Sequence, residues 1–436
     1  MNTCCGGFAN FGTYIIHQIS YMTTCCGVVV VLLTLAQISY IIPQISHMTT
    51  RVAVDFSKVP SPCFVLDEKL LRQNLQLIRN VMDEAGCQII LALKGFSMYS
   101  AFPIVKEYLP GATASSLNEI KLVNEYLGYR AHAYVPAYQD ADFQDILEGS
   151  SHLTFNTLSQ WERFKKRVAA FNNENPTQAV SCGIRVNPQY SEVETDMYNP
   201  CVPGSRLGVT RDQFGDALPA GIDGIHFHTL CENGADTLER TLEALEARFG
   251  DLLHQAKWLN MGGGHLMTRE GYDLEKLILL IQTIKKKYNL EVILEPGSAI
   301  AWRTGYLTAT VLDLMHSQGI EVAILDTSFA AHMPDTLEMP YKPRILGAHH
   351  EPVTGKPTYR LGGMTCLAGD FMGDYSFDEP LKVGDQLVFD DMIHYTMVKT
   401  TTFNGVGLPS IGIWQADNTF RLVRSYGYES FKDRLS

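Results

Sequence analysis

The stretch Ile89-Ile-Leu-Ala-Leu-Lys94 is a short apolar run that ends in a lysine. Consecutive aliphatic residues are typical of a buried strand, so the pattern predicts a strand with a primary amine at its carboxyl end. A lysine in this position is often one whose stem lies along apolar surface while its amine stays in solvent. The alternative is a covalent amine catalyst, and the rest of the chain decides between the two.

Further strand-like runs alternate with amphipathic segments on both sides of Lys94, which indicates a parallel β/α architecture. The eight predicted strands are 89–93, 112–114, 131–135, 152–155, 180–186, 224–228, 258–261 and 292–295. Apolar residues at three- and four-residue spacing predict helices over 68–84, 117–127, 159–171, 237–249 and 274–288. Together they predict a TIM-type (β/α)8 barrel over residues 68–300, with chemistry at the carboxyl ends of its strands.

After Trp302 the pattern changes to β-rich runs separated by Gly, Pro and Asp turns. These runs, at 306–312, 322–325, 386–389 and 420–423, predict a C-terminal β-rich domain over residues 301–436. Residues 51–67 are extended, and we expect them to join that domain as one of its strands. The predicted fold class is therefore α/β, a barrel followed by a β-rich domain.

The composition is that of an ordinary globular protein, with 436 residues, 46% hydrophobic and 19% charged. The formal net charge of −12 argues against nucleic acid as a partner and favours a cationic ligand. The ten cysteines show no CxxC pairs and no regular disulfide spacing. A reducing cytoplasm fits this usage best, and we expect neither a metal nor a membrane partner.

The first fifty residues contain no Asp, Glu, Lys or Arg, and they repeat themselves. Residues 14–24 return almost unchanged as residues 40–50, as duplicated DNA would produce. The apolar stretch 27–36 is about half the length that a membrane span needs, and no basic region precedes it. We interpret residues 1–50 as a non-native or unstructured extension translated from upstream sequence, with Met48 as the working start. The alternative is a genuine anchor or signal.

Several features downstream of Lys94 carry further chemical groups. In chain order they are His228, Gly262-Gly263-Gly264, Glu295-Pro-Gly297, Thr365-Cys366, and Tyr395 shortly before Phe403-Asn-Gly405. Taken alone, each feature has an ordinary structural explanation: His228 as a core histidine, the glycines as a turn, Glu295 as a solvated carboxylate and Cys366 as a small buried thiol. However, barrels often bind phosphate after the seventh strand through backbone N–H groups that glycine leaves accessible. A carboxylate beside a pyridine nitrogen would also favour its protonated form.

The order and spacing of this set resemble the decarboxylases of the alanine racemase-like fold, which include ornithine and diaminopimelate decarboxylases. The resemblance implies pyridoxal 5'-phosphate as cofactor and Lys94 as its Schiff-base lysine. It implies that His228 stacks on the cofactor ring and that Glu295 pairs with the ring nitrogen. It also implies that the glycine triplet and Tyr395 contact the phosphate.

The segment around Cys366 resembles the family's loop whose cysteine returns a proton to the α-carbon. In relatives this loop reaches into the partner's site, so the resemblance implies a homodimer with shared active sites. Asp370 matches an aspartate of the same loop, and Arg206 sits at the position that pairs with such an aspartate across the interface. Relatives differ from this chain at Ser298, where arginine is common, at Leu367, where an acidic residue is usual, and at Thr113, which replaces an aspartate.

Three acidic segments resemble the branch of the family that acts on carboxynorspermidine and carboxyspermidine. They are 326–335, 338–341 and 370–374. The predicted function is therefore pyridoxal phosphate-dependent decarboxylation of such a carboxypolyamine in polyamine biosynthesis. The predicted binding residues for its ammonium groups are Asp326, Asp335, Glu338 and Asp370, with Asp374 as a further candidate. The alternative within the family is a diaminopimelate or other basic amino acid decarboxylase.

Two functions from other classes remain. His226 and His228 fall on one face of a strand, and with Asp326 they could form a metal-dependent hydrolase site. The histidines expected at strand ends five and seven of such a barrel are missing. A cofactor carrier without turnover is the second alternative, against which the β-rich domain and the Cys366 loop both argue.

Overall fold

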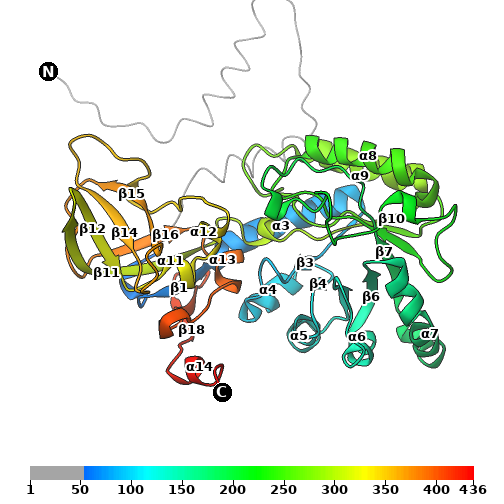
Figure 1. The fold of residues 1–436 in the computed structure, drawn as a ribbon, viewed down its shortest axis with the longest axis horizontal. Helices are drawn as coiled ribbons and strands as arrows, with labels where there is room; N and C mark the ends of the chain where they lie inside the picture. Colours follow the sequence, from blue (N-terminus) through cyan, green and yellow to red (C-terminus); the bar gives the residue numbers. More distant parts are fainter. Residues whose placement is uncertain (1–53) are drawn as a thin grey trace, which may run out of the picture. The chain divides into compact units, whose positions relative to one another are not determined.

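The computed structural model describes residues 54–436, and the expectations about residues 1–50 lie outside this part of the chain. Two nine-stranded sheets organise the described residues (Figure 1). One sheet is the barrel, and the other belongs to the β-rich domain. Within residues 54–436, no helix combines the length and apolar character that crossing a membrane requires.

The barrel has the strand order β2-β10-β9-β8-β7-β6-β5-β4-β3, and its neighbouring strands run parallel. β2 and β3 are halves of one strand on either side of Ile90, whose N–H donates to the Leu294 carbonyl at 3.0 Å. The next N–H, of Leu91, donates to Gly111 at 3.1 Å. The first strand thus pairs with both the last and the second strand, which closes the barrel and confirms the predicted fold class.

The barrel strands are β2 (Gln88–Ile89), β3 (Leu91–Ala92), β4 (Ala112–Ala114), β5 (Ala131–Tyr134), β6 (Ser150–Phe155), β7 (Ser181–Arg185), β8 (Gly224–His226), β9 (Trp258–Asn260) and β10 (Glu291–Leu294). The helices of this region are α3 (Glu68–Ala85), α4 (Phe102–Lys106), α5 (Leu117–Leu122), α6 (Phe143–Gly149), α7 (Leu158–Glu174), α8 (Ala235–Leu253), α9 (Leu274–Tyr288) and α10 (Ser298–Ala301). Each predicted strand lies within about two residues of an observed one.

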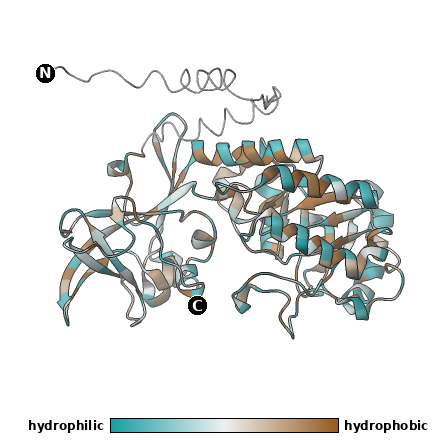
Figure 2. Ribbon diagram, turned by 90° about the horizontal axis from the view of Figure 1, so that it is seen from above, coloured by the Kyte–Doolittle hydropathy of each residue, from teal (hydrophilic) through white to brown (hydrophobic). Residues whose placement is uncertain are grey.

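The helices cover the outside of the barrel, and hydrophobic residues gather on the strands and on the inner faces of the helices (Figure 2). Helix α3 shows why these residues form a helix. Asp67 caps its start by accepting from the N–H groups of Lys69 and Leu70, and Gly86 ends it in the left-handed region. The buried side chains lie at helical spacing, namely Leu71, Leu75, Ile78, Val81, Met82 and Ala85.

The β-rich domain has the strand order β13-β15-β14-β12-β11-β1-β17-β18, with β16 paired to β11. Its strands are β1 (Cys63–Asp67), β11 (Gly305–Ser317), β12 (Ile320–Leu325), β13 (Ala348–His349), β14 (Thr358–Gly362), β15 (Phe371–Phe377), β16 (Gln386–Asp390), β17 (Ser410–Trp414) and β18 (Phe420–Arg424). Four short helices accompany them, α11 (Phe329–His332), α12 (Asp335–Glu338), α13 (Tyr395–Val398) and α14 (Glu429–Lys432). Strand β1 lies between β11 and β17 and leads directly into α3 of the barrel.

Candidate active site

A cavity of about 590 Å³ opens at the carboxyl ends of the barrel strands. Side chains from six of these strand ends line it, including Lys94 after β3, His228 after β8 and Glu295 after β10. Lys94 is accessible from this cavity although the barrel surrounds it. The three residues that the sequence places at strand ends therefore converge on one space.

Lys94 and His228 form the centre of the site. The Lys94 Nζ and His228 Nε2 atoms are 3.2 Å apart, and the Gly263 N–H donates to His228 Nδ1 at 2.9 Å. Because Nδ1 accepts, a neutral imidazole carries its proton on Nε2 and donates it toward the lysine. Burial lowers the pKa of His228 well below its usual value, and burial also lowers the pKa of the Lys94 amine. The arrangement favours an uncharged, nucleophilic amine on Lys94.

Glu295 supplies the one carboxylate that lines this cavity from a barrel strand end. Its Oε1 atom accepts from the Asn260 amide at 2.6 Å, and its Oε2 atom lies 3.7 Å from His226 Nε2. Burial raises the pKa of Glu295, while the bond from Asn260 and the charge of Lys94 oppose that rise. Burial keeps the pKa of His226 well below its usual value, so His226 is no cationic partner. A cation placed beside Glu295 would therefore favour the charged carboxylate.

Arg185 is a buried cation in the cavity wall that the sequence interpretation missed. It ends β7, is only 3% exposed, and donates to the His228 carbonyl at 3.1 Å. Its guanidinium lies over the Tyr134 ring, 4.7 Å from the centroid. A charge at a strand end is the same signal that identified Lys94. It was overlooked because the predicted strand extends to Val186 and so places Arg185 inside it.

The loops after β8, β9 and β10 come close enough that only glycine fits. A Cβ atom at Gly263 would lie 2.5 Å from the Glu295 carbonyl, and one at Gly264 would lie 2.1 Å from the Leu230 carbonyl. Gly264 also has a φ of +87°. The Tyr395 hydroxyl, from α13 of the β-rich domain, lies 2.7 Å from a Cβ built on Gly297. We call Gly262, Gly263, Gly264, Gly297, Ser298 and Tyr395 the glycine cradle.

The loop that carries Cys366 lies apart from the cavity. Cys366 is exposed, and its N–H donates to the Asn404 side chain at 2.9 Å. Asp370 of the same loop is 4% exposed and accepts four hydrogen bonds within its own domain. These come from the Ser328 hydroxyl, the Ala330 N–H, and the N–H and hydroxyl of Thr365. Its carboxylate is therefore fully engaged in holding this loop, while Arg206 is exposed in the cavity lining.

The remaining acidic candidates differ in their surroundings. Asp326 accepts from the Thr310 N–H at 2.7 Å, and Asp374 forms a two-bond pair with Arg360 at 2.9 and 3.2 Å. Glu338 pairs with the amine of Lys399. Asp335 is 7% exposed and accepts from Tyr341 and Thr396 on Oδ2, whereas its Oδ1 atom has no hydrogen-bond partner among the described residues.

Tyr198 lines the cavity and lies within electrostatic range of Asp335 and Glu338. The charges of these two carboxylates and of Lys399 act on the pKa of its hydroxyl. Burial raises the pKa of Tyr198 and Lys399 opposes that rise. Tyr198 belongs to the long loop between β7 and β8, where neither periodicity nor a motif marks a functional residue.

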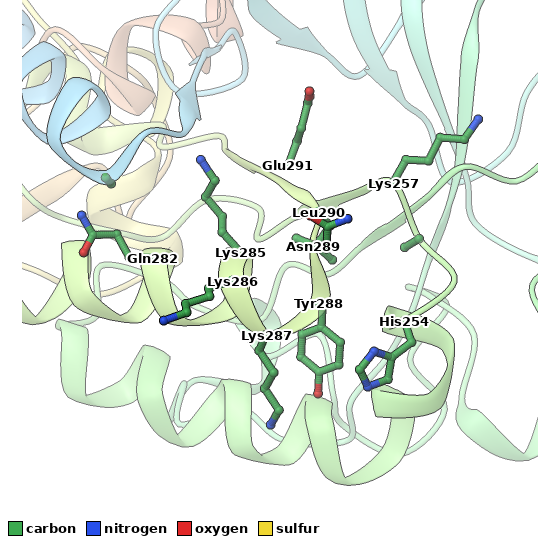
Figure 3. A pocket seen from close by; sticks show the side chains of 12 residues that line it. His254, Lys257, Gln282, Lys285, Lys286, Lys287, Tyr288, Asn289, Leu290 and Glu291 are labelled. Atoms are coloured by element: carbon green, nitrogen blue, oxygen red, sulfur yellow. The ribbon is translucent and has the colours of Figure 1, made fainter.

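A second cavity, of about 960 Å³, lies near the amino ends of β9 and β10. Lys285, Lys286 and Lys287 contribute to its lining, but their side chains point in different directions (Figure 3). Nothing there resembles the convergent groups around Lys94. Residues 54–436 also contain no group of three or more His, Cys, Asp and Glu side chains able to hold a metal ion.

A closed barrel with an amine, an imidazole and a buried carboxylate at its rim, beside a glycine cradle, has the groups that pyridoxal phosphate needs. The amine can react with the cofactor aldehyde, and the carboxylate suits a cationic ring nitrogen. Gly263 and Gly264, where a Cβ would collide with the Glu295 and Leu230 carbonyls, let the loops that carry these groups pack closely together. The residues fit the cofactor.

Comparison with known proteins agrees with this assignment. A family model described as "Pyridoxal-dependent decarboxylase, C-terminal sheet domain" matches residues 63–393. The chain is 50% identical over 380 residues to carboxyaminopropylagmatine decarboxylase of Synechocystis sp., covering 87% of this chain and 96% of the relative. It is 41% identical over 389 residues to carboxynorspermidine/carboxyspermidine decarboxylase of Campylobacter jejuni, covering 87% and 99%.

A solved structure gives the same result. The crystal structure of carboxynorspermidine decarboxylase complexed with norspermidine from Campylobacter jejuni is similar with a TM-score of 0.79 and 40% identity, covering 86% of this chain and 100% of that one. The chain belongs to the pyridoxal-dependent decarboxylases, and it is an enzyme that uses pyridoxal phosphate.

Proposed function

We propose that this enzyme decarboxylates carboxynorspermidine or carboxyspermidine to the corresponding polyamine. The observation that carries the proposal is the convergence of Lys94, His228 and Glu295 on one cavity of a chain whose relatives act on carboxypolyamines. The relatives named for carboxypolyamines support it more than they support a diaminopimelate decarboxylase. Bound pyridoxal phosphate supplies an electron sink that accepts the charge left when CO₂ departs.

The barrel residues have distinct roles in this proposal. Lys94 holds the cofactor through its uncharged amine, which the imidazole of His228 orients. Glu295 pairs with the ring nitrogen and keeps it protonated, and the bond from Asn260 fixes its orientation. Tyr395 and Gly264 bind the phosphate with neutral donors, since the N–H groups of Gly262 and Gly263 already donate to Asn260 and His228.

Asp335 and Glu338 are the strongest candidates for the ammonium groups of the substrate. Asp335 has a buried oxygen with a free acceptor position, and both residues act electrostatically on Tyr198 in the cavity wall. Ammonium donors would satisfy such an oxygen. The sequence also predicts Asp326 and Asp370 as binding residues for these ammonium groups. Their hydrogen bonds within the β-rich domain indicate a structural role for both carboxylates instead.

We further propose that Cys366 returns the proton to the α-carbon in the active site of a partner subunit. Cys366 is exposed, as are its neighbours Met364, Leu367 and Phe371, which could pack against a second copy of the chain. A cytoplasmic location accords with the free thiols of all six cysteines within residues 54–436.

A second candidate substrate is carboxyaminopropylagmatine, which the name of the 50%-identical relative specifies. Its chain ends in a guanidinium group, whereas carboxynorspermidine ends in an ammonium group. Both are cations that a carboxylate such as Asp335 can bind. The two substrates therefore share the barrel chemistry and differ only at the far end of the chain.

The test is CO₂ release from each carboxypolyamine, from carboxyaminopropylagmatine, and from ornithine and diaminopimelate as controls. We expect kcat/KM for at least one carboxypolyamine to exceed that for the two amino acids by about a hundredfold or more. A preference for diaminopimelate or ornithine would refute the proposal. A preference for carboxyaminopropylagmatine would replace the first candidate with the second.

A further inference from the structure

His226 is a buried histidine in the cavity wall whose ring nitrogens both lack a hydrogen-bond partner. It ends β8, is only 2% exposed, and lines the cavity together with Lys94 and Glu295. Neither Nδ1 nor Nε2 has a partner among the described residues. Such an imidazole costs free energy, because its donor and its acceptor have both lost water and gained nothing in exchange. It is therefore a reason to look for the partner that it meets when the site is loaded.

The barrel interior is closed on the amino-terminal side of His226. Gly224 and His226 point to the same face of β8, and Gly224 is in register with Trp258 of β9. The Trp258 indole fills this level of the barrel, since a Cβ at Gly183 or Gly224 would collide with it. Its N–H donates to the Ser181 hydroxyl at 2.9 Å and so is not available to His226. We therefore look for the partner of His226 among the groups that face the cavity.

Glu295 is the acceptor that lies nearest to the His226 ring. Its Oε2 atom is 3.7 Å from His226 Nε2, about 1 Å longer than a hydrogen bond. The other oxygen, Oε1, accepts from the Asn260 amide at 2.6 Å, so the carboxylate is already held on one side. A small rotation of either side chain would close the remaining gap and satisfy the imidazole.

The charge state of His226 suits a donor to a carboxylate that serves another cation. Burial, together with the charges of Arg185 and Lys94, keeps the pKa of His226 well below its usual value. A neutral imidazole donates one N–H and leaves the negative charge of Glu295 unpaired. A histidinium would pair with that charge and weaken the hold of Glu295 on a cationic ring nitrogen. His226 can thus orient the carboxylate without competing with the cofactor ring.

We propose that His226 is a positioning residue for Glu295, and that its Nε2–H donates to Glu295 Oε2 in the enzyme with bound cofactor. The carboxylate is then held at both oxygens, by Asn260 and by His226, and each oxygen keeps a second lone pair for the ring nitrogen. The added hydrogen bond stabilises the charged carboxylate, so the proton between Glu295 and the ring nitrogen stays on the nitrogen. This deepens the proposed role of Glu295 and rests on it.

Nitrogen NMR of the enzyme loaded with isotope-labelled pyridoxal phosphate tests the proposal, because the chemical shift reports whether the ring nitrogen carries a proton. His226→Phe removes the donor and keeps an aromatic ring beside Tyr134, whereas His226→Gln keeps an N–H donor. We expect a protonated nitrogen in the wild type and in His226→Gln. His226→Phe should move the resonance toward the unprotonated position and lower kcat about tenfold. A protonated nitrogen in His226→Phe, or equal losses in both variants, would overturn the proposal, because the N–H donor would then make no difference.

Two further measurements separate this proposal from those on which it rests. In holoenzyme with isotope-labelled histidine, the ring resonances that vanish in His226→Gln should show a proton on Nε2, and a proton on Nδ1 would contradict the proposal. An unprotonated cofactor nitrogen in the wild type would refute the role of Glu295 as well. The ranking of carboxypolyamines by kcat/KM should be the same in the wild type and both variants, since His226 acts at the ring. A changed ranking with an unchanged cofactor resonance would assign His226 to the substrate instead.

Discussion

Buried carboxylates at the barrel rim and in the loops of the β-rich domain differ in how completely the protein satisfies them. Glu295 at the rim accepts a short hydrogen bond from Asn260, also interacts with the Thr113 side chain, and faces a neutral His226 at 3.7 Å. Asp370 in the β-rich domain accepts four hydrogen bonds from its own loop and from α11. The first retains capacity for a ligand, and the second has used its capacity to hold the fold.

We expect this difference to separate carboxylates that bind a ligand from carboxylates that hold the fold. A buried acid without enough partners costs free energy, and a bound cation can recover that cost. An acid whose acceptor positions are filled gains nothing from a ligand unless its loop rearranges. Asp335 is an exception within the β-rich domain, since one of its oxygens is buried and has no partner among the described residues.

Lys94→Ala tests the rim most strongly. We expect kcat/KM to fall by more than about a thousandfold, because the substitution removes the amine that lies 3.2 Å from His228. The visible absorbance of a lysine-bound cofactor should disappear with it. Lys286→Ala, in the cavity at the other end of the barrel, is the matched control and should leave both unchanged. Retention of the visible band in Lys94→Ala would show that another lysine holds the cofactor.

Glu295→Gln should have the next largest effect. An amide cannot pair with a cationic ring nitrogen, so we expect kcat to fall about a hundredfold while the protein still binds cofactor. The control is Glu291→Gln at the exposed start of the same strand, which should retain full activity. If Glu295→Gln were as active as the control, the rim carboxylate would have no role in the chemical step.

Asp335→Asn and Asp326→Asn compare two acids within the β-rich domain. We expect Asp335→Asn to raise KM for a carboxypolyamine about tenfold, with kcat nearly unchanged, because a charge-assisted hydrogen bond to the substrate is lost. Asp326→Asn should leave KM unchanged, since one oxygen of that carboxylate already accepts from the Thr310 N–H and, unlike Asp335, it has no buried oxygen without a partner among the described residues. The opposite ranking in steady-state kinetics would place the ammonium site at Asp326.

The positions of the residues at the barrel rim, meaning the carboxyl ends of its strands, were largely predictable because they follow strands. Lys94, His228 and Glu295 each follow a recognisable apolar run by at most two residues, and the parallel barrel brings such positions to one end. Strand boundaries and barrel closure follow from the same alternation of apolar runs and amphipathic segments. Arg185 was missed only because its strand was predicted one residue too long.

Loop carboxylates were not predictable in the same way. The orientation of Asp370 depends on Ser328 and Ala330, which are 42 and 40 residues away and are brought near by the fold. No periodicity in the sequence encodes such a contact between residues far apart along the chain.

Asp370→Asn should reveal a structural role. We expect the free energy of unfolding to fall by about 1–3 kcal/mol, because the amide cannot accept all four hydrogen bonds. Denaturant unfolding measures this loss, and kcat/KM per folded molecule should change by less than about tenfold. Unchanged stability with a large rise in KM would instead assign Asp370 to the substrate.

Acid stability gives the smallest expected effect and tests both regions together. Burial lowers the pKa of His332, in the β-rich domain, to about 4 and that of His265, in the barrel, also to about 4. The unfolded chain takes up these protons below about pH 6.5, whereas the folded chain does not until about pH 4. The unfolded state therefore binds more protons across this window, so stability falls as the pH drops, by about 1 kcal/mol per histidine at pH 5.5.

Replacing each histidine by glutamine distinguishes cooperative from separate unfolding of the two regions. If the chain from residue 54 onward unfolds as one unit, His332→Gln and His265→Gln should each flatten the same pH dependence of a single transition. Two transitions, each altered by only one of the two variants, would mean that the barrel and the β-rich domain unfold independently. Asp370→Asn would then destabilise its own domain without affecting the rim that carries Lys94.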